Sequence, residues 1–173
     1  GIHTDAGRSI WPWRDWVLKA FRDNVPFDTF TIEQIAGDLL PNATLDQKIA
    51  TGFNRNHPTN SEAGEEEDEY RSAYVIDRVN TTATTFLGLT LACTQCHDHK
   101  YDPLTQKDYY QFYAYFNNIK ERDADFSNPR PTLPAPNPDQ AARLKDLQAK
   151  IKTLEKRLGT EDPLTNEAQK EWE

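Results

Sequence analysis

Apolar residues between positions 11 and 53 recur at the spacing of α-helices. The first set lies on one face of a helix that is predicted to begin near Pro12 and end before Pro26: Trp13, Trp16, Val17, Ala20 and Phe21. Proline suits the first turn of a helix and breaks one further along. Two more helices are predicted, Ile32–Leu40 with Thr31 as its cap and Leu45–Phe53 with Thr44 as its cap.

The middle of the chain is predicted to be a polar loop followed by a long helix. Residues 54–64 are rich in Asn, Pro, Ser and Gly, a composition typical of loops. The acidic run 65–69 then opens a helix, because the helix dipole favours negative charge in the first turn. This helix is predicted to extend to Phe86, although the β-branched run 81–85 weakens it.

Two further helices are predicted in the last third of the chain. Thr105 caps the first, whose aromatic residues cover nearly its whole circumference, so we expect it to be buried: Tyr109, Tyr110, Phe112, Tyr113, Tyr115 and Phe116. A proline-rich linker follows at 127–138. Asn137 then caps an amphipathic helix that Gly159 ends and whose apolar positions form an a/d seam: Leu144, Leu147, Ile151, Leu154 and Leu158. Because so short a seam is not stable alone, we expect it to pack on another surface.

The composition indicates a folded, aromatic-rich domain with polar extensions. The 173 residues include 4 Trp, 7 Tyr and 8 Phe, more than a disordered chain carries. The net charge of −8 would repel a phosphate backbone, so nucleic-acid binding is not expected. No apolar run is long enough to predict a transmembrane segment. The chain begins with glycine and contains no methionine, so we expect it to be a piece of a longer protein.

Both cysteines lie in one pentapeptide, Cys93-Thr94-Gln95-Cys96-His97. Cys-x-x-Cys-His is the attachment sequence of c-type haem. Two thiols on one helical turn can reach the two vinyl groups on one porphyrin edge, and the adjacent imidazole can reach the iron. We therefore expect one haem c bonded to Cys93 and Cys96, with His97 as its proximal iron ligand. Neighbouring apolar residues are expected to line its slot: Phe86, Leu87, Leu89, Leu91, Tyr101 and Leu104.

Three other interpretations of the thiols stay open. A dithiol redox motif normally follows a strand in a βαβ unit, and no such strand is predicted. A zinc ion could use Cys93, Cys96, His97 and His99, although structural zinc sites usually gather two separated pairs of ligands. A zinc site could also take His57 or His3 as a ligand. A disulfide between the two cysteines would close a short and strained ring.

The second axial position of a haem is less constrained by the sequence. Methionine, the common partner in high-potential cytochromes c, is absent. His57 and His3 are the candidate distal ligands, because His99 lies too near His97 along the chain to reach the opposite haem face. The alternatives are a weaker donor such as Lys or Tyr, or an open position. A second histidine would favour electron transfer, whereas an open position would admit peroxide or oxygen.

Several blocks of the sequence resemble the cytochrome-c-like domains of large planctomycete surface proteins. They occur in the same order along roughly residues 8–120: Trp13–Trp16, Pro26–Asp28, Phe30–Pro41, Val79–Thr90, Cys93–Pro103 and Gln106–Asn118. The resemblance implies an extracytoplasmic protein, longer than this chain, with other domains on both sides. It also implies covalent haem at Cys93 and Cys96 with His97 as ligand. Members of this family are often associated with polysaccharide-degrading gene sets.

These observations predict a mainly α fold in three parts. Helices wrapped around one covalently attached c-type haem form residues 1–126, the proline-rich linker is 127–138, and an amphipathic helix and tail form 139–173. Residues 139–158 are expected to mediate self-association or a domain contact.

The expected function is electron transfer to a redox partner protein or a neighbouring cytochrome, in the periplasm or at the cell surface. One alternative is a haem enzyme with an open distal site, peroxidase-like or oxygen-dependent and linked to polysaccharide breakdown. Another is an interaction module in which the motif holds a structural metal or a disulfide.

Overall fold

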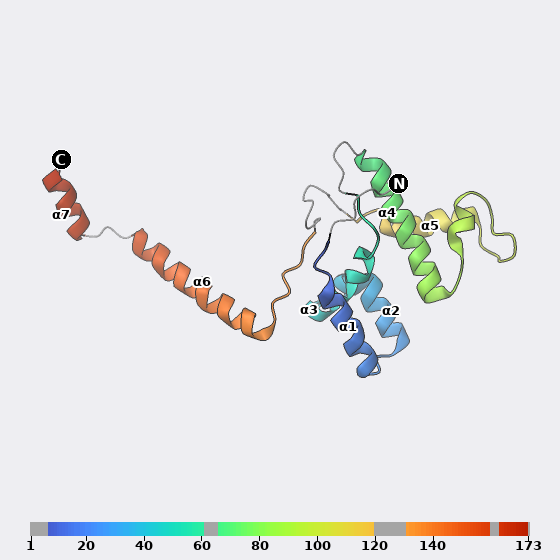
Figure 1. The fold of residues 1–173 in the computed structure, drawn as a ribbon, viewed down its shortest axis with the longest axis horizontal. Coiled ribbons are helices and arrows are strands. Elements are labelled where there is room, and N and C mark those ends of the chain that lie inside the picture. Colours follow the sequence, from blue (N-terminus) through green and yellow to red (C-terminus); the bar gives the residue numbers. More distant parts are fainter. Residues whose placement is uncertain (1–6, 61–65, 120–130, 160–162, 173) are drawn as a thin grey trace. The chain divides into compact units, whose positions relative to one another are not determined.

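The computed structural model describes residues 7–60, 66–119, 131–159 and 163–172. These residues are mainly helical and include no β-strand, so the predicted mainly α fold is confirmed for them (Figure 1). The chain divides into two units, Gly1–Leu133 and Pro134–Glu173, and the division falls inside the predicted linker.

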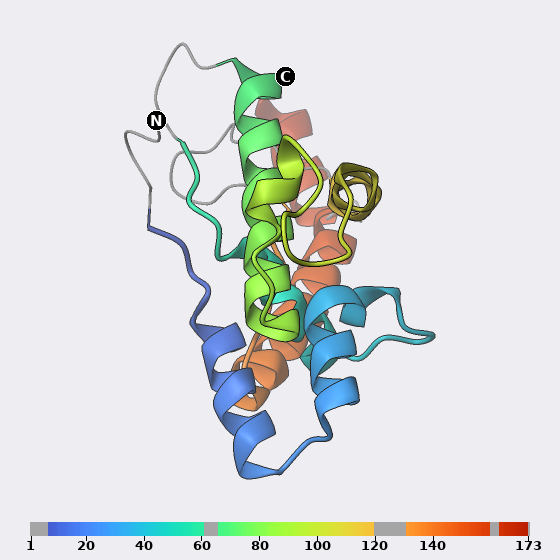
Figure 2. The same ribbon diagram turned by 90° about the vertical axis from the view of Figure 1, so that its right-hand side faces the viewer.

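The described part of the first unit contains five α-helices joined by short helical turns. The helices are α1 (Trp11–Arg22), α2 (Phe27–Ala36), α3 (Leu45–Ala50), α4 (Glu67–Thr82) and α5 (Gln106–Phe116). The turns are η1 (Gly37–Leu39), η2 (Thr51–Arg55), η3 (Ala83–Leu87) and η4 (Leu91–Gln95). Figure 2 shows α5 end-on beside α4, so the two helices, which are in contact, cross rather than run along each other.

Helices α1 to α3 share one hydrophobic cluster. Trp16, Ala20 and Ala50 are its buried members. The rings of Trp16 and Phe30 stack with their centroids 5.5 Å apart, which joins α1 to α2. The predicted apolar face of α1 is therefore confirmed at Trp16 and Ala20, whereas Phe21 is 72% exposed at the end of the helix.

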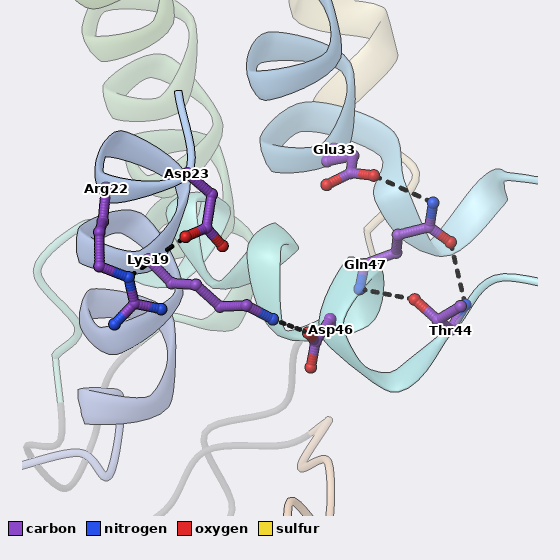
Figure 3. A network of polar contacts seen from close by, with 7 residues as sticks. All are labelled: Lys19, Arg22, Asp23, Glu33, Thr44, Asp46 and Gln47. Atoms are coloured by element: carbon purple, nitrogen blue, oxygen red, sulfur yellow. Dashed lines mark hydrogen bonds and ion pairs between the residues drawn. The ribbon is translucent and has the colours of Figure 1, made fainter. Parts of the chain in front are cut away.

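Polar contacts tie the same three helices together at their surface (Figure 3). Lys19 Nζ of α1 lies 2.9 Å from Asp46 Oδ2 of α3, and Gln47 Nε2 of α3 donates to Glu33 Oε1 of α2 at 3.0 Å. Thr44 and Gln47 form a capping box, which confirms the predicted cap. These groups line a cavity of about 260 Å³, in which Lys19 pairs with Asp46 and Glu33 accepts a hydrogen bond from Gln47.

The predicted start of the second helix was wrong. Helix α2 begins at Phe27, directly after Pro26, and Thr31 lies within it, where its Oγ1 donates to the carbonyl of Phe27 at 2.8 Å. Proline ends a preceding helix but also suits the start of the next, because its fixed φ matches that position. Here Pro26 directly precedes α2, whereas α1 already ends at Arg22.

Gly37 allows η1 to approach α3 closely. A Cβ atom at this position would lie 2.3 Å from the backbone oxygen of Gln47, and a backbone atom cannot move aside as a side chain can. We expect Gly37→Ala to lower the free energy of unfolding by about 1–3 kcal/mol, the usual cost of overpacking. Urea denaturation measures it, with Gly7→Ala as control because a Cβ there meets nothing within 4 Å. Equal stability of the two variants would contradict the close approach.

A second hydrophobic cluster lies beneath the Cys93–His97 segment. Its buried residues come from α4, η3, η4 and α5: Val75, Val79, Ala83, Leu91, Tyr109 and Phe116. The β-branched run 81–85 does not stop the long helix, which continues to Thr82 and then widens into the π-helical turn η3. Gly88, with φ of 65°, ends this turn in the left-handed conformation that glycine adopts without strain.

Only one face of the aromatic helix α5 is buried. Tyr109 and Phe116 face the cluster, whereas Tyr110 is 49% and Tyr115 is 75% exposed. The prediction of burial nearly all round was therefore wrong, because α4 and η4 cover a single face of the helix.

The second unit contains α6 (Pro138–Leu158) and α7 (Pro163–Trp172). The predicted start of α6 is confirmed by a capping box between Asn137 and Gln140, and Gly159 follows its last residue. All five seam residues of α6 are exposed. None of the helices in the described ranges combines the length and apolar character needed to cross a lipid bilayer.

Candidate functional site

The Cys93–His97 segment forms a helical turn at the surface of the first unit. The backbone N–H groups of Cys96 and His97 both donate to the carbonyl of Cys93, at 3.4 Å. Both cysteines are exposed and free. The turn therefore presents two unbonded thiols and an exposed imidazole to solvent.

Two residues of η4, three positions apart, anchor this turn to the core. Leu91 and Thr94 are buried, and Thr94 Oγ1 donates to the carbonyl of Leu91 at 2.6 Å. Because Thr94 lies between the two cysteines in sequence and points inward, Cys93 and Cys96 are left on the outer side. The thiols are thus held by the packing of neighbours rather than by contacts of their own.

The first two turns of α5 contact the other side of the motif. Tyr110 Oη and Gln106 Nε2 each donate to the carbonyl of Gln95 at 3.1 Å. The backbone N–H of Gln106 donates to Asp98 Oδ1 at 2.8 Å. Three hydrogen bonds therefore join α5 to the residues on either side of Cys96.

A capping box fixes the start of α5. Thr105 Oγ1 accepts from the Asp108 N–H, and Asp108 Oδ2 accepts from the Thr105 N–H at 2.8 Å and from its hydroxyl at 2.7 Å. The predicted cap at Thr105 is confirmed. The hydrogen bond from the Thr105 hydroxyl, followed by that from its backbone N–H, lowers the pKa of Asp108.

This lowered pKa predicts an acid-sensitive contribution to stability. The unfolded chain has the ordinary Asp pKa of about 3.9. The stabilisation by ionised Asp108 is therefore fully present above that value and is lost as the pH falls through the lower folded pKa. We expect Asp108→Asn to destabilise the protein at neutral pH and to differ less from wild type below about pH 4. Urea denaturation between neutral and acidic pH measures this, and a difference that is independent of pH would contradict it.

His97 has one ring nitrogen free. Its Nδ1 lies 2.7 Å from the carbonyl oxygen of Asp98, which can only accept, so Nδ1 carries the proton. The lone pair is then on Nε2, to which no group among the described residues donates. Histidines that bind metals commonly have this arrangement, with the second ring nitrogen donating to a carbonyl.

His57 has both ring nitrogens engaged. It is 3% exposed, its Nδ1 lies 2.9 Å from the carbonyl of Pro58, and its Nε2 pairs with an Arg78 amino group of α4. Arg78 Nε also donates to the carbonyl of Asn54 at 2.8 Å. His57 and Arg78 therefore hold the 54–60 segment on α4. The role of Arg78 could not be predicted from the sequence, because its partners are more than twenty positions away.

His99 differs from His97 in its hydrogen bonds. His99 Nδ1 accepts from the backbone N–H of Asp102 at 2.9 Å, and His99 N–H donates to Leu104, so this residue closes the 99–104 turn. His3 lies outside the described residues. In the part of the chain that the structure describes, His97 is thus the histidine with a free lone pair beside the thiols.

The geometry of the same residues can be compared with the other interpretations of the motif. No three His, Cys, Asp or Glu side chains in the described ranges converge as a metal-binding group, so the zinc set with His99 is not assembled. The thiols of Cys93 and Cys96 form no disulfide. No strand precedes the motif in residues 66–92, unlike the βαβ setting of dithiol redox motifs.

The residues around the motif fit an apolar cofactor in part. Leu91 and Leu104 belong to the core, and Phe86 packs on Phe53 with ring centroids 5.1 Å apart, so these do not line a slot. Leu87 and Tyr101 are 58% and 82% exposed and remain available to cover an apolar ring. The free thiols, the free His97 nitrogen and these exposed side chains are compatible with a haem.

Comparison with known proteins gives one result that bears on identity. The model of the family PSCyt2, described as a protein of unknown function (DUF1549), matches residues 1–121. No curated protein and no solved structure matches. The matched range includes helices α1 to α5 and the cysteine motif. The family name refers to a planctomycete cytochrome-like domain, in agreement with the resemblance at that level. Because the match covers well over half of the 173 residues, the chain belongs to the PSCyt2 family.

Proposed function

We propose that the protein is a c-type cytochrome module that transfers electrons through one haem bonded to Cys93 and Cys96, with His97 as proximal ligand. The main observation in support of the proposal is the hydrogen bonding of the His97 ring. Its Nδ1 donates to a backbone carbonyl, which leaves Nε2 free directly beside two free thiols. When bound, the haem supplies a one-electron couple between ferric and ferrous iron.

The chain's own residues orient the ligands. The Asp98 carbonyl fixes the His97 tautomer and the orientation of its ring. Tyr110 and Gln106 donate hydrogen bonds to the Gln95 carbonyl, which joins the turn that bears the thiols to α5. A ligand set held in this way needs little reorganisation between oxidation states, which suits electron transfer.

The hydrogen bond between Arg78 and His57 supports a second candidate function, because it bears on the distal iron ligand. Because Arg78 occupies His57 Nε2, His57 is better explained as a structural residue than as an iron ligand. The remaining possibilities are His3, a weaker donor such as Lys or Tyr, or an open position. An open position supports a haem enzyme that uses peroxide or oxygen as co-substrate, which is the alternative to a pure electron carrier.

The setting of the module follows from the resemblance. We propose that it acts outside the cytoplasm as one domain of a longer surface protein, with a redox protein or neighbouring cytochrome as its partner. Covalent attachment of haem is compatible with that compartment.

Absorption spectroscopy and redox titration test this function. The protein is produced with a c-type maturation system, and its reduced form is mixed with carbon monoxide. Rapid binding identifies an open position and slow or absent binding a strong distal ligand. A reversible one-electron titration supports the carrier, and peroxide turnover well above that of free haem contradicts it. His57→Gln should leave the spectrum unchanged if His57 is structural.

A further inference from the structure

Helix α6 carries a row of exposed apolar side chains along its whole length. It is one continuous helix of 21 residues (Figure 1). The five members of the row are between 44% and 86% exposed: Leu144, Leu147, Ile151, Leu154 and Leu158. An apolar stripe on a helix is stable in water only when another surface covers it. The spacing of this row and the charges beside it indicate which surface fits.

The row is narrow and has polar borders. Its members alternate by three and four positions, which places 144, 151 and 158 at a and 147 and 154 at d of a heptad repeat. The e and g positions between 143 and 157 are polar: Arg143, Gln148, Lys150, Glu155 and Arg157. A strict a/d row with polar borders fits a second helix. A helix that lies on a membrane has a large apolar face instead.

A second copy of α6 fits this row when it runs parallel and in register. Each a or d residue then meets its own counterpart, so all five layers are apolar. Ile151 lies at a between Leu147 and Leu154 at d, a combination that favours two strands. Lys150 at g faces Glu155 at e of the other copy, and the symmetry repeats this pair. Both the apolar and the charged positions are thus complementary to themselves.

An antiparallel copy fits less well. In that arrangement a residues face d residues, and each g position faces another g position. With Leu147 placed opposite Ile151, Leu158 faces Gln140 and one apolar layer is lost. Lys150 then faces its own counterpart, and like charges at short distance repel.

We propose that α6 of two copies of the chain forms a parallel two-stranded coiled coil, with Lys150 of each copy beside Glu155 of the other. Lys150 Nζ also lies 2.7 Å from Asp146 Oδ2 of its own helix, but this pair is exposed, contributes little and does not oppose the contact. Parallel pairing makes both linkers leave the coiled coil at the same end. The dimer therefore joins two first units, each with its own Cys93–His97 segment. The pairing uses no residue before Pro138 and is independent of the proposed haem.

Sedimentation equilibrium of the full 173-residue chain, from micromolar to millimolar concentration, tests the pairing. Because α6 is short, we expect a dimer that dissociates on dilution. Ile151→Glu puts two carboxylates opposite each other in the row and should remain monomeric throughout. Ala149→Glu is the matched control, since it adds the same charge at an exposed position outside the row and should dimerise like wild type. Circular dichroism checks that both variants keep their helices.

Exchange of the flanking charges tests the parallel orientation. Lys150→Glu places carboxylates, and Glu155→Lys ammonium groups, opposite each other in both facing pairs. Each variant alone should therefore dimerise about tenfold more weakly than wild type. An equimolar mixture of the two should regain the dimer, because every facing pair then has opposite charges.

A wild-type chain that stays monomeric over the whole range overturns the proposal, and so does a dimer that survives Ile151→Glu. Charge variants that associate like wild type, or a mixture that regains no dimer, overturn the parallel pairing. Haem uptake enters none of these results, so the electron-transfer function stands or fails separately.

Discussion

Replacing Cys93 and Cys96 together by serine is expected to yield a folded protein that carries no covalently bound haem. The thioether bonds cannot form without the sulfur atoms. Folding should survive, because both side chains are exposed and lie outside the two hydrophobic clusters. Haem retention after denaturing electrophoresis measures attachment, and circular dichroism checks the helices.

Two controls make this result specific to the motif. His97→Gln keeps both thiols, so haem should stay attached while its spectrum changes through loss of the axial ligand. Serine at Cys93 alone should leave a single bond through Cys96. Haem that remains bound to the double serine variant after denaturation would place the attachment elsewhere and contradict the assignment.

The largest expected loss of stability follows from Arg78→Met. Methionine has a similar length but leaves the Asn54 carbonyl and His57 Nε2 without their donor in a buried site. Each unsatisfied buried group costs about 1–3 kcal/mol, so the free energy of unfolding should fall by about 2–5 kcal/mol. Urea denaturation at neutral pH measures it.

Arg22→Met is the matched control for Arg78→Met. The Arg22 side chain is 74% exposed and pairs with its neighbour Asp23, so its loss should cost less than about 0.5 kcal/mol. If the two variants were equally stable, the Arg78–His57 pair would not be structural. His57 would then be free to serve as a distal ligand, against the assignment made above.

The sequence predicted helix starts best where the signal is local. Thr44, Thr105 and Asn137 each cap a helix through a residue three positions later, and all three caps are present. The start of α2 was missed because Thr31 resembles a cap while Pro26 is the residue that precedes the helix. Helix α7 was not predicted, because the residues after Gly159 were expected to form a tail.

Burial and long-range pairing were harder to predict. The sequence indicated that α5 is rich in aromatic residues, but it did not indicate which face of the helix its neighbours cover. The exposure of Tyr115 was therefore not predicted. The cysteine motif was visible because its residues are contiguous. The pairing of Arg78 with His57 was not, since an arginine within a helix is most often solvated and only the tertiary fold brings the two together.

The most direct test of the central claim is the mass and absorption spectrum of the wild-type protein, purified from cells that mature c-type cytochromes and then denatured. We predict a coloured polypeptide whose mass exceeds that of the chain by one haem, and whose reduced spectrum is that of a c-type cytochrome. A colourless protein with the mass of the bare chain, or one that releases its haem on denaturation, would contradict covalent attachment at Cys93 and Cys96.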